Sequence, residues 1–228
     1  MRSTLLSAVS HDLRTPLATI TGAATMLLDA EDRLPPDERR GLIAAVAEEA
    51  FHLERLVASL LDMTRLESGA LTVKKEWVPL DEVVGSALAR VEERLGRREV
   101  TTHLPSDVVF VQADPVLLQQ VLVNLLENAA RHTPPRTPVD VDARLVDDVV
   151  EISVADRGPG LPAGVDVFGK FVRGPGARTV GAGLGLAIVR GLVAAHGGSV
   201  TAANRSGGGA VVVVRLPWSP APVAEAPA

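Results

Sequence analysis

Two long stretches of helical periodicity, joined by a proline turn, occupy the first third of the sequence. Apolar side chains recur every three or four positions over residues 3–29, and the same spacing returns over residues 42–63. Pro35-Pro36 separates the two patterns, and Ser68-Gly69 ends the second one. These features predict an antiparallel pair of amphipathic helices. Because a lone hairpin cannot bury both apolar stripes, we expect a second copy to complete a four-helix bundle as a homodimer.

The rest of the chain mixes short Val- and Thr-rich segments with further helical periods, which predicts an α+β chain. We expect an extended segment over 71–79, helices over 80–95, 115–132 and 183–196, and strands near 98–103, 108–112, 139–145, 149–154, 199–204 and 210–216. This mixture is typical of an α/β sandwich with a mostly antiparallel sheet. The resulting domains are 1–69 and 70–218, followed by a Pro- and Ala-rich tail, 219–228, that we expect to be disordered.

Composition narrows the classes of function. The chain has 228 residues, of which 46% are apolar, so it can build two small domains. Its net charge of −5 and the lack of a long basic run argue against nucleic acid as a partner. The absence of cysteine excludes disulfides and thiolate metal sites. No apolar run reaches the roughly 18 residues that span a bilayer, so the chain as given should be soluble and membrane attachment would need a region upstream of it.

The first candidate site lies within the first predicted helix, at residues 10–17, with the sequence SHDLRTPL. His11 falls on the face opposite the apolar stripe, where an imidazole can act as a nucleophile if the neighbouring Asp12 accepts its second proton. Thr15 lies one turn further along the same face and could position a water molecule. Pro16 costs about 3 kcal/mol inside a helix and predicts a bend beside His11. The alternative is a solvated surface histidine beside a chance proline.

The second candidate site is a polar helix face with Gln120, Asn124, Asn128 and His132 at steps of four. Two carboxamides one turn apart can offer oxygen ligands to Mg²⁺. Arg131 is placed to meet a phosphate, and His132 to pack against a base. The alternative is an ordinary solvated helix face.

Two glycine-containing motifs follow. Asp156-Arg157-Gly158-Pro159-Gly160 comes directly after a predicted strand, where a carboxylate can accept a hydrogen bond from an exocyclic amine and glycines allow close backbone approach. The alternative for this motif is a simple turn. The segment 181–186, GAGLGL, opens a helix whose amides suit phosphates. It lacks the lysine of a P-loop and the preceding strand of a Rossmann unit, so alone it is weak evidence.

In this order the four motifs resemble the H-box, N-box, G1 box and G2 box of the sensor histidine kinases. Phe168 and Phe171 resemble the F-box of that family. The resemblance runs from residue 1 to about residue 217. The segments 60–69 and 76–80 are most similar to the Kdp-type potassium sensor kinases. The fold that the resemblance implies is a dimeric helical hairpin followed by an ATPase domain of the histidine-kinase/gyrase type.

The resemblance also implies roles for individual residues. His11 corresponds to the phosphoacceptor, Asp12 to its catalytic acidic neighbour and Thr15 to the position that serves phosphatase activity. The nucleotide-site residues that match are the Mg²⁺-binding Asn128 with Asn124 nearby, the nucleotide-contacting Arg131 and His132, the adenine-binding Asp156, the glycines that flank the ATP lid (Gly158, Gly160, Gly181, Gly183 and Gly185), and Arg173 at the phosphate-gripping position. The segment between Gly160 and Phe168 is shorter than is usual in the family, and His132 replaces a frequent Tyr.

The function that follows is that of an ATP-dependent protein-histidine kinase. It would phosphorylate His11 from ATP with Mg²⁺ and pass the phosphoryl group to an aspartate of a response regulator, in the cytoplasm. One alternative is a non-kinase ATPase of the gyrase and chaperone type, against which the His11 hairpin argues. Another is a silent dimerisation module, against which the intact nucleotide motifs argue. Of the remaining histidines, we expect His52 to be solvated and His196 to end a helix before Gly197-Gly198.

Overall fold

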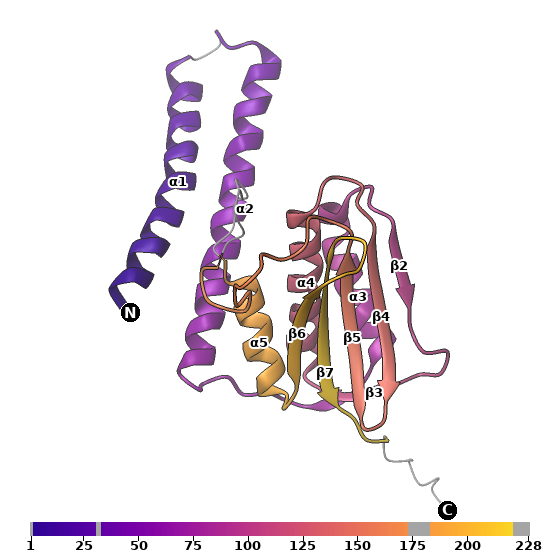
Figure 1. Cartoon of the computed structure of the whole chain (residues 1–228). Helices are drawn as coiled ribbons and strands as arrows, with labels where there is room; N and C mark the ends of the chain where they lie inside the picture. The colour runs from indigo at the N-terminus through magenta and orange to yellow at the C-terminus, as the bar shows by residue number, and fades with distance from the viewer. Residues whose placement is uncertain (1, 31–32, 173–182, 221–228) are drawn as a thin grey trace, which may run out of the picture.

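A helical hairpin and an α/β sandwich make up the computed structural model, which describes residues 2–30, 33–172 and 183–220, with side chains from Leu13 onward. Helices α1 (Arg2–Asp29) and α2 (Pro36–Glu67) run antiparallel beside the sandwich (Figure 1). α2 begins with proline, and Asp37 and Glu38 in its first turn suit the positive end of the helix dipole. It ends before Gly69, whose φ of +65° favours glycine. The predicted hairpin is confirmed.

The sandwich contains one main sheet with the strand order β2-β4-β5-β7-β6. Its strands are β2 (Val100–His103), β4 (Val139–Val146), β5 (Val149–Asp156), β6 (Ser199–Asn204) and β7 (Ala210–Pro217). β2 pairs with β4 in parallel, and all other neighbouring strands of this sheet are antiparallel. A separate antiparallel pair is formed by β1 (Glu76–Pro79) and β3 (Phe110–Ala113). The mostly antiparallel sheet that the sequence predicts is therefore confirmed.

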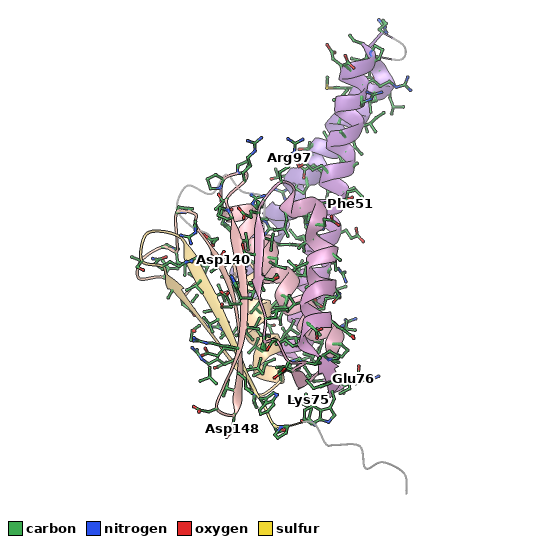
Figure 2. The ribbon with its side chains drawn as sticks, turned by 90° about the vertical axis from the view of Figure 1, so that its right-hand side faces the viewer. Phe51, Lys75, Glu76, Arg97, Asp140 and Asp148 are labelled. Carbon is green, nitrogen blue, oxygen red and sulfur yellow. The ribbon has the colours of Figure 1, made fainter. Side chains whose placement is uncertain are left out.

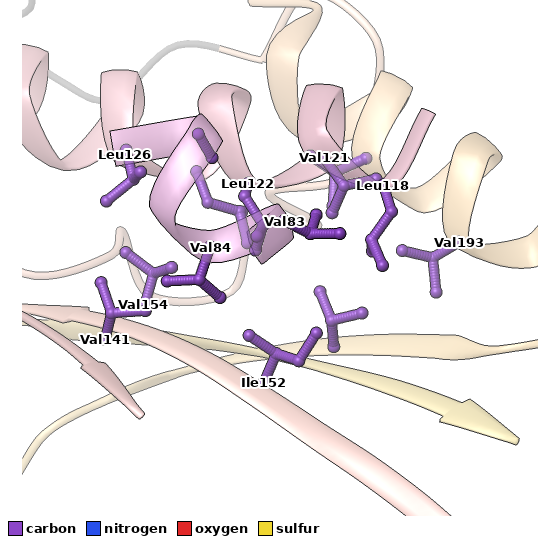
Figure 3. Close-up of a cluster of buried hydrophobic side chains, with 14 of the residues drawn as sticks. Val83, Val84, Leu118, Val121, Leu122, Leu126, Val141, Ile152, Val154 and Val193 are labelled. Carbon is purple, nitrogen blue, oxygen red and sulfur yellow. The ribbon is translucent and has the colours of Figure 1, made fainter. Parts of the chain in front are cut away.

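Three helices cover one face of the main sheet: α3 (Leu80–Leu95), α4 (Pro115–His132) and α5 (Gly185–Ala195) (Figure 1). Figure 2 shows the same layers from the side, with Asp140 on the sheet, Asp148 in the turn between β4 and β5, and Phe51 on the hairpin. The core between the layers is drawn in Figure 3, where Val83, Leu122 and Ile152 from a helix pair and the sheet meet. Each is at most 4% exposed, and apolar burial of this kind stabilises the sandwich by about 25 cal/mol per Å².

The start of α4 is held by a capping residue and a buried histidine. Asp114 accepts hydrogen bonds through Oδ1 from the amides of Val116 and Leu117, each at 3.2 Å. The amide of Asp114 donates to Nε2 of His196 at 3.1 Å, while Nδ1 of His196 lies 2.8 Å from the carbonyl oxygen of Leu192. These two bonds require the tautomer with the proton on Nδ1. His196 ends α5, as predicted, and also joins α5 to the first turn of α4.

The C-terminal half of α2 packs on the sandwich through α5. Leu66 fills the space beside Gly191, where an added Cβ would come within 2.7 Å of Leu66 Cδ1. Gln120 on α4 donates a hydrogen bond to Asp62 of α2. α2 consequently lies between α1 and the sandwich (Figure 1). Among the residues that the structure describes, no helix is long and apolar enough to cross a membrane.

Candidate functional site

A pocket of about 550 Å³ opens where four segments of the chain meet. Its walls are formed by α2, the C-terminal half of α4, the loop after β5 and the first residues of α5. The volume lies in the range of small-molecule and cofactor sites. Apolar groups, including Leu125, Val154 and Val212, form its floor, and polar groups converge on it from the rim. The pocket therefore suits a flat ring at one end and a charged group at the other.

The polar face of α4 contributes four of the predicted residues, Asn124, Asn128, Arg131 and His132. The opposite face of the helix is buried in the core, so these side chains project towards the pocket. Gln120 belongs to the same sequence row but does not line the pocket, because its amide binds Asp62. Asn124 and Asn128 make no hydrogen bond with any residue in the described part of the chain, which leaves their amide groups available to a ligand.

Asp156 ends β5 at the floor of the pocket. Its Oδ1 accepts hydrogen bonds from the amides of Gly158 at 2.8 Å and Ala210 at 3.3 Å. Within the described residues Oδ2 has no hydrogen-bond donor. The carboxylate is thus held by one oxygen, and the other can accept a hydrogen bond from an exocyclic amine.

The two glycines after Asp156 are sterically required. A Cβ at Gly158 would lie 2.6 Å from Cγ2 of the buried Thr133. Gly160 has a φ of +83°, and a Cβ there would lie 2.7 Å from Oδ1 of Asn204. Thr133 and Asn204 are residues that sequence reasoning missed, and no local pattern points to them because the contacts join distant segments.

The amino end of α5 closes the pocket opposite Asp156. Gly183 has a φ of +64°, and its Cβ would lie 2.7 Å from the carbonyl oxygen of Val172. Gly185 begins α5 beside Asn128. The first amides of a helix have no intrahelical acceptor and carry the positive end of the dipole, so this end of the pocket favours an anion.

Positive charge gathers at the last turn of α4, which also lines the pocket. Glu127 is paired with both Arg94 and Arg131, the latter at 3.7 Å. Burial, and secondarily the nearby Arg55, lowers the pKa of Arg131 below the ordinary value, although an arginine stays charged at neutral pH. The pKa of His132 is also lowered, first by desolvation and then by Arg131, against an opposing effect of Asp156. His132 is therefore neutral at pH 7 and suited to stack on a base.

The hairpin supplies the fourth wall of the pocket through His52, Arg55, Leu56 and Ser59 of α2. The expectation that His52 is solvated is wrong, because only 9% of the residue is exposed. Its position on a predicted helix could not show that the sandwich covers that side. Arg55 was not predicted to belong to the site, and only the docking of α2 on the sandwich brings it there.

The remaining predicted residues are not among the described residues that line the pocket. Thr15 lies on α1, and no described residue of α1 lines the pocket. His11 and Asp12 lie on the same helix, but their side chains are outside the described part of the chain, as are Gly181 and Arg173. Of the two predicted F-box residues, Phe168 is buried, with the Arg190 guanidinium 6.0 Å from its ring centroid.

These groups fit a purine nucleotide with its phosphates towards α5. An acceptor at Asp156 and an apolar floor suit the base, whereas Arg131 and the free amides suit the phosphates. The described residues hold no cluster of three or more His, Cys, Asp or Glu for a metal ion. The amide oxygen of Asn128, with that of Asn124 one turn away, is of the kind that Mg²⁺ binds, and phosphate oxygens and water would have to supply the other ligands.

Comparison with known proteins identifies both halves of the chain. Residues 1–69 match the family model described as His Kinase A (phospho-acceptor) domain. Residues 113–220 match the model described as histidine kinase-, DNA gyrase B-, and HSP90-like ATPase. A phosphoacceptor hairpin before the ATPase domain does not favour a gyrase- or chaperone-type ATPase, and the complete nucleotide pocket does not favour a silent dimerisation module.

Several known proteins are similar over most of this chain. The sensor protein KdpD of Escherichia coli (strain K12) is 42% identical over 229 residues, which cover 99% of this chain and 25% of that protein. The solved structure of the mycobacterial sensor histidine kinase MprB is 32% identical and has a TM-score of 0.59, covering 64% of this chain and 100% of that one. The histidine kinase ThkA in complex with response regulator protein TrrA shares the fold, with a TM-score of 0.73 and 22% identity, covering 95% of this chain and 61% of that one.

The chain spans about a quarter of the length of the curated KdpD relatives that it matches. Its ATPase domain implies ATP binding, in agreement with the pocket described above. A phosphoacceptor hairpin precedes the ATPase domain in this chain, and the whole arrangement is similar to KdpD and MprB. These two findings identify the family. The chain belongs to the sensor histidine kinases, and it is the two-domain catalytic core of such a protein, similar to the Kdp-type sensors.

Proposed function

We propose that this chain phosphorylates its own His11 from Mg-ATP and passes the phosphoryl group to an aspartate of a response regulator. The observation that carries the proposal is the pocket in which Asp156, Asn128, Arg131 and the start of α5 converge beside the hairpin that carries His11. In this proposal domain 1–69 accepts the phosphoryl group, and domain 70–218 binds ATP.

In the proposed reaction, an imidazole nitrogen of His11 attacks the γ-phosphorus of ATP. A nitrogen–phosphorus bond forms, the bond from the γ-phosphorus to the bridging oxygen breaks, and ADP leaves. Asp12 accepts the proton that the imidazole loses. Asp156 accepts a hydrogen bond from the adenine amine, and Arg131 with the amides of α5 holds the phosphates. Mg²⁺, bound through Asn128, would neutralise charge on the phosphate oxygens.

Labelling with γ-labelled ATP tests the proposal. The protein should acquire a phosphoryl group that is lost in acid and retained in alkali, as a phosphoramidate is. His11→Ala should abolish labelling while calorimetry still detects ATP binding, and His103→Ala, which changes an exposed strand histidine, should label normally. Label that survives in the His11→Ala protein would exclude His11 as the acceptor.

The proposed working unit is a homodimer formed through the hairpin. Large apolar side chains on α1 and α2 remain exposed, among them Met26 at 55%, Leu28 at 77% and Phe51 at 61%. Covering them with a second hairpin would form a four-helix bundle. Light scattering should therefore give twice the mass of one chain at micromolar concentration.

The proposed phosphoryl acceptor is a response regulator, by analogy with the partner of ThkA. Thr15 lies one turn after His11 on α1, where it would orient the water that removes phosphate from the regulator. We place these reactions in the cytoplasm, where ATP is available, with any attachment to a membrane made by a region outside this sequence.

A further inference from the structure

Arg55 occupies an unusual place on the hairpin. It lines the nucleotide pocket from α2, next to His52 and Ser59, and its side chain is half-buried. The arginines near it, Arg94 and Arg131, are both paired with Glu127. Arg55 makes no ion pair or hydrogen bond with any residue in the described ranges. A guanidinium held at a pocket wall without an acceptor is available to an anionic ligand.

The charges around Arg55 favour an anion at this end of the pocket. Arg55 and Arg131 lie close enough for their charges to repel, and Arg55 also acts on Arg94. Glu127 is the carboxylate that Arg94 and Arg131 share. Because Arg94 also lies near Arg90 and Glu93, four cations face two carboxylates in this group. A bound polyphosphate would offset the repulsion between these arginines, because each guanidinium would be attracted to its negative charge. Because Arg131 belongs to the predicted phosphate end, Arg55 faces the phosphates and not the base.

The level of Arg55 along the hairpin matches that of His11. His11 lies about 27 Å along α1 from its end at Asp29, and Arg55 lies about 28 Å along α2 from its start at Pro36, at a rise of about 1.5 Å per residue. Because the two helices are antiparallel neighbours (Figure 1), these lengths put both residues at nearly the same level along the hairpin. A two-fold axis along a four-helix bundle preserves height, so the match holds for His11 of either subunit.

We infer that Arg55 is a further catalytic residue, which contacts the γ-phosphoryl group of ATP and stabilises its negative charge during transfer to His11. The hairpin thus supplies both the acceptor and a cation for the reaction, while the sandwich supplies the nucleotide site. Arg55 would touch the γ-phosphate and not ADP. This inference rests on the proposed kinase function.

Three variants test the inference in the full 228-residue chain. Arg55→Gln removes the charge, Arg55→Lys keeps it, and Arg40→Gln makes the same change of charge on an exposed part of α2 far from the pocket. The measurements are the rate of His11 phosphorylation at saturating Mg-ATP and the calorimetric affinity for Mg-ADP. Loss of a charge-assisted hydrogen bond should slow Arg55→Gln by about 10- to 100-fold, and Arg55→Lys should recover part of the rate.

The affinity for Mg-ADP separates a direct contact from a structural role. Arg55→Gln should bind Mg-ADP within about twofold of the unchanged chain, because ADP lacks the γ-phosphate. Arg40→Gln should match the unchanged chain in both measurements. A rate for Arg55→Gln equal to that of Arg40→Gln, or a parallel loss of Mg-ADP affinity, would overturn the inference. An unchanged chain that takes up no label would instead overturn the proposed function itself.

Discussion

Asn128 of α4 and Gly185 of α5 touch across the phosphate end of the pocket. A Cβ at Gly185 would lie 3.4 Å from Nδ2 and 3.5 Å from Oδ1 of Asn128. The contact places Asn128, a proposed metal ligand, beside amides that have no intrahelical acceptor. A magnesium ion and the phosphates of a nucleotide would therefore be bound side by side. Variants at this contact should for that reason change the affinity for Mg-nucleotide.

Asn128→Ala should weaken nucleotide binding mainly when Mg²⁺ is present. The variant loses the amide oxygen that we propose as a metal ligand but keeps every contact to the base. We expect a loss of about 10-fold or more in Mg-ATP affinity and little change in affinity for ATP measured in chelator. Calorimetry with and without Mg²⁺ distinguishes these cases. Equal losses in both buffers would contradict the proposed role.

Asp156→Asn should weaken ATP binding whether or not Mg²⁺ is present. The amide keeps an oxygen for the amides of Gly158 and Ala210. Its nitrogen, however, replaces the oxygen that would accept from the adenine amine, so a donor would face a donor. The loss should reach about 10-fold or more, and the preference for ATP over GTP should narrow. If ATP affinity is retained, Asp156 does not contact the base.

Gly158→Ala should disrupt the pocket through a clash with Thr133. The new methyl group would lie 2.6 Å from Thr133 Cγ2, so the loop after β5 must move. Thr133→Ser removes that methyl group while keeping a hydroxyl for the bond to the carbonyl oxygen of Ala129. The double variant should therefore recover much of the ATP affinity that Gly158→Ala loses. Calorimetry on both single variants and the double variant measures this, and the absence of any recovery would assign the defect to another contact.

His132 should make folding stability depend on pH. Its pKa is lowered in the folded protein by desolvation and by Arg131, so the folded state binds fewer protons than the unfolded chain just below about pH 6.5. Stability should therefore fall as the pH is lowered through this window. His132→Gln removes the group that titrates and should flatten the change in Tm between about pH 7.5 and 5.5. If calorimetric melting gives the same change of Tm with pH for His132→Gln as for the unchanged chain, other titrating groups determine the pH dependence of stability.

His196→Ala should destabilise the sandwich without touching the pocket. The side chain is 2% exposed and bonds both the amide of Asp114 and the carbonyl oxygen of Leu192. Its removal leaves a cavity and the amide of Asp114 without a partner, while the carbonyl oxygen of Leu192 keeps its bond from the backbone amide of residue 196, so we expect a loss of about 2–4 kcal/mol in the free energy of unfolding. Denaturant titration measures this, with exposed His103→Ala as the matched control. A change below about 0.5 kcal/mol would contradict the anchoring role.

Local pattern accounts for most of the secondary structure. The helical periods of α1 to α4 and the alternation in β5 can be read from spacing alone, since each element has one buried face. The order of the four motifs likewise indicated the pocket residues on α4 and after β5. The parallel pairing of β2 with β4 could not be read in this way, because alternation shows which face is buried but not which strand lies alongside.

Docking of the hairpin on the sandwich determined which residues of α2 belong to the pocket. From the sequence alone, we expect His52 to be solvated and do not predict Arg55 as part of the site, because the surface of a helix is solvated unless another domain covers it. Contacts between Leu66 and Gly191 and between Asp62 and Gln120 bring the sandwich onto that side of α2. His52 is buried and Arg55 enters the nucleotide pocket for this reason. Such contacts join residues far apart in the chain. They are stabilised by close packing between two folded surfaces, and the periodicity of one segment carries no information about that packing.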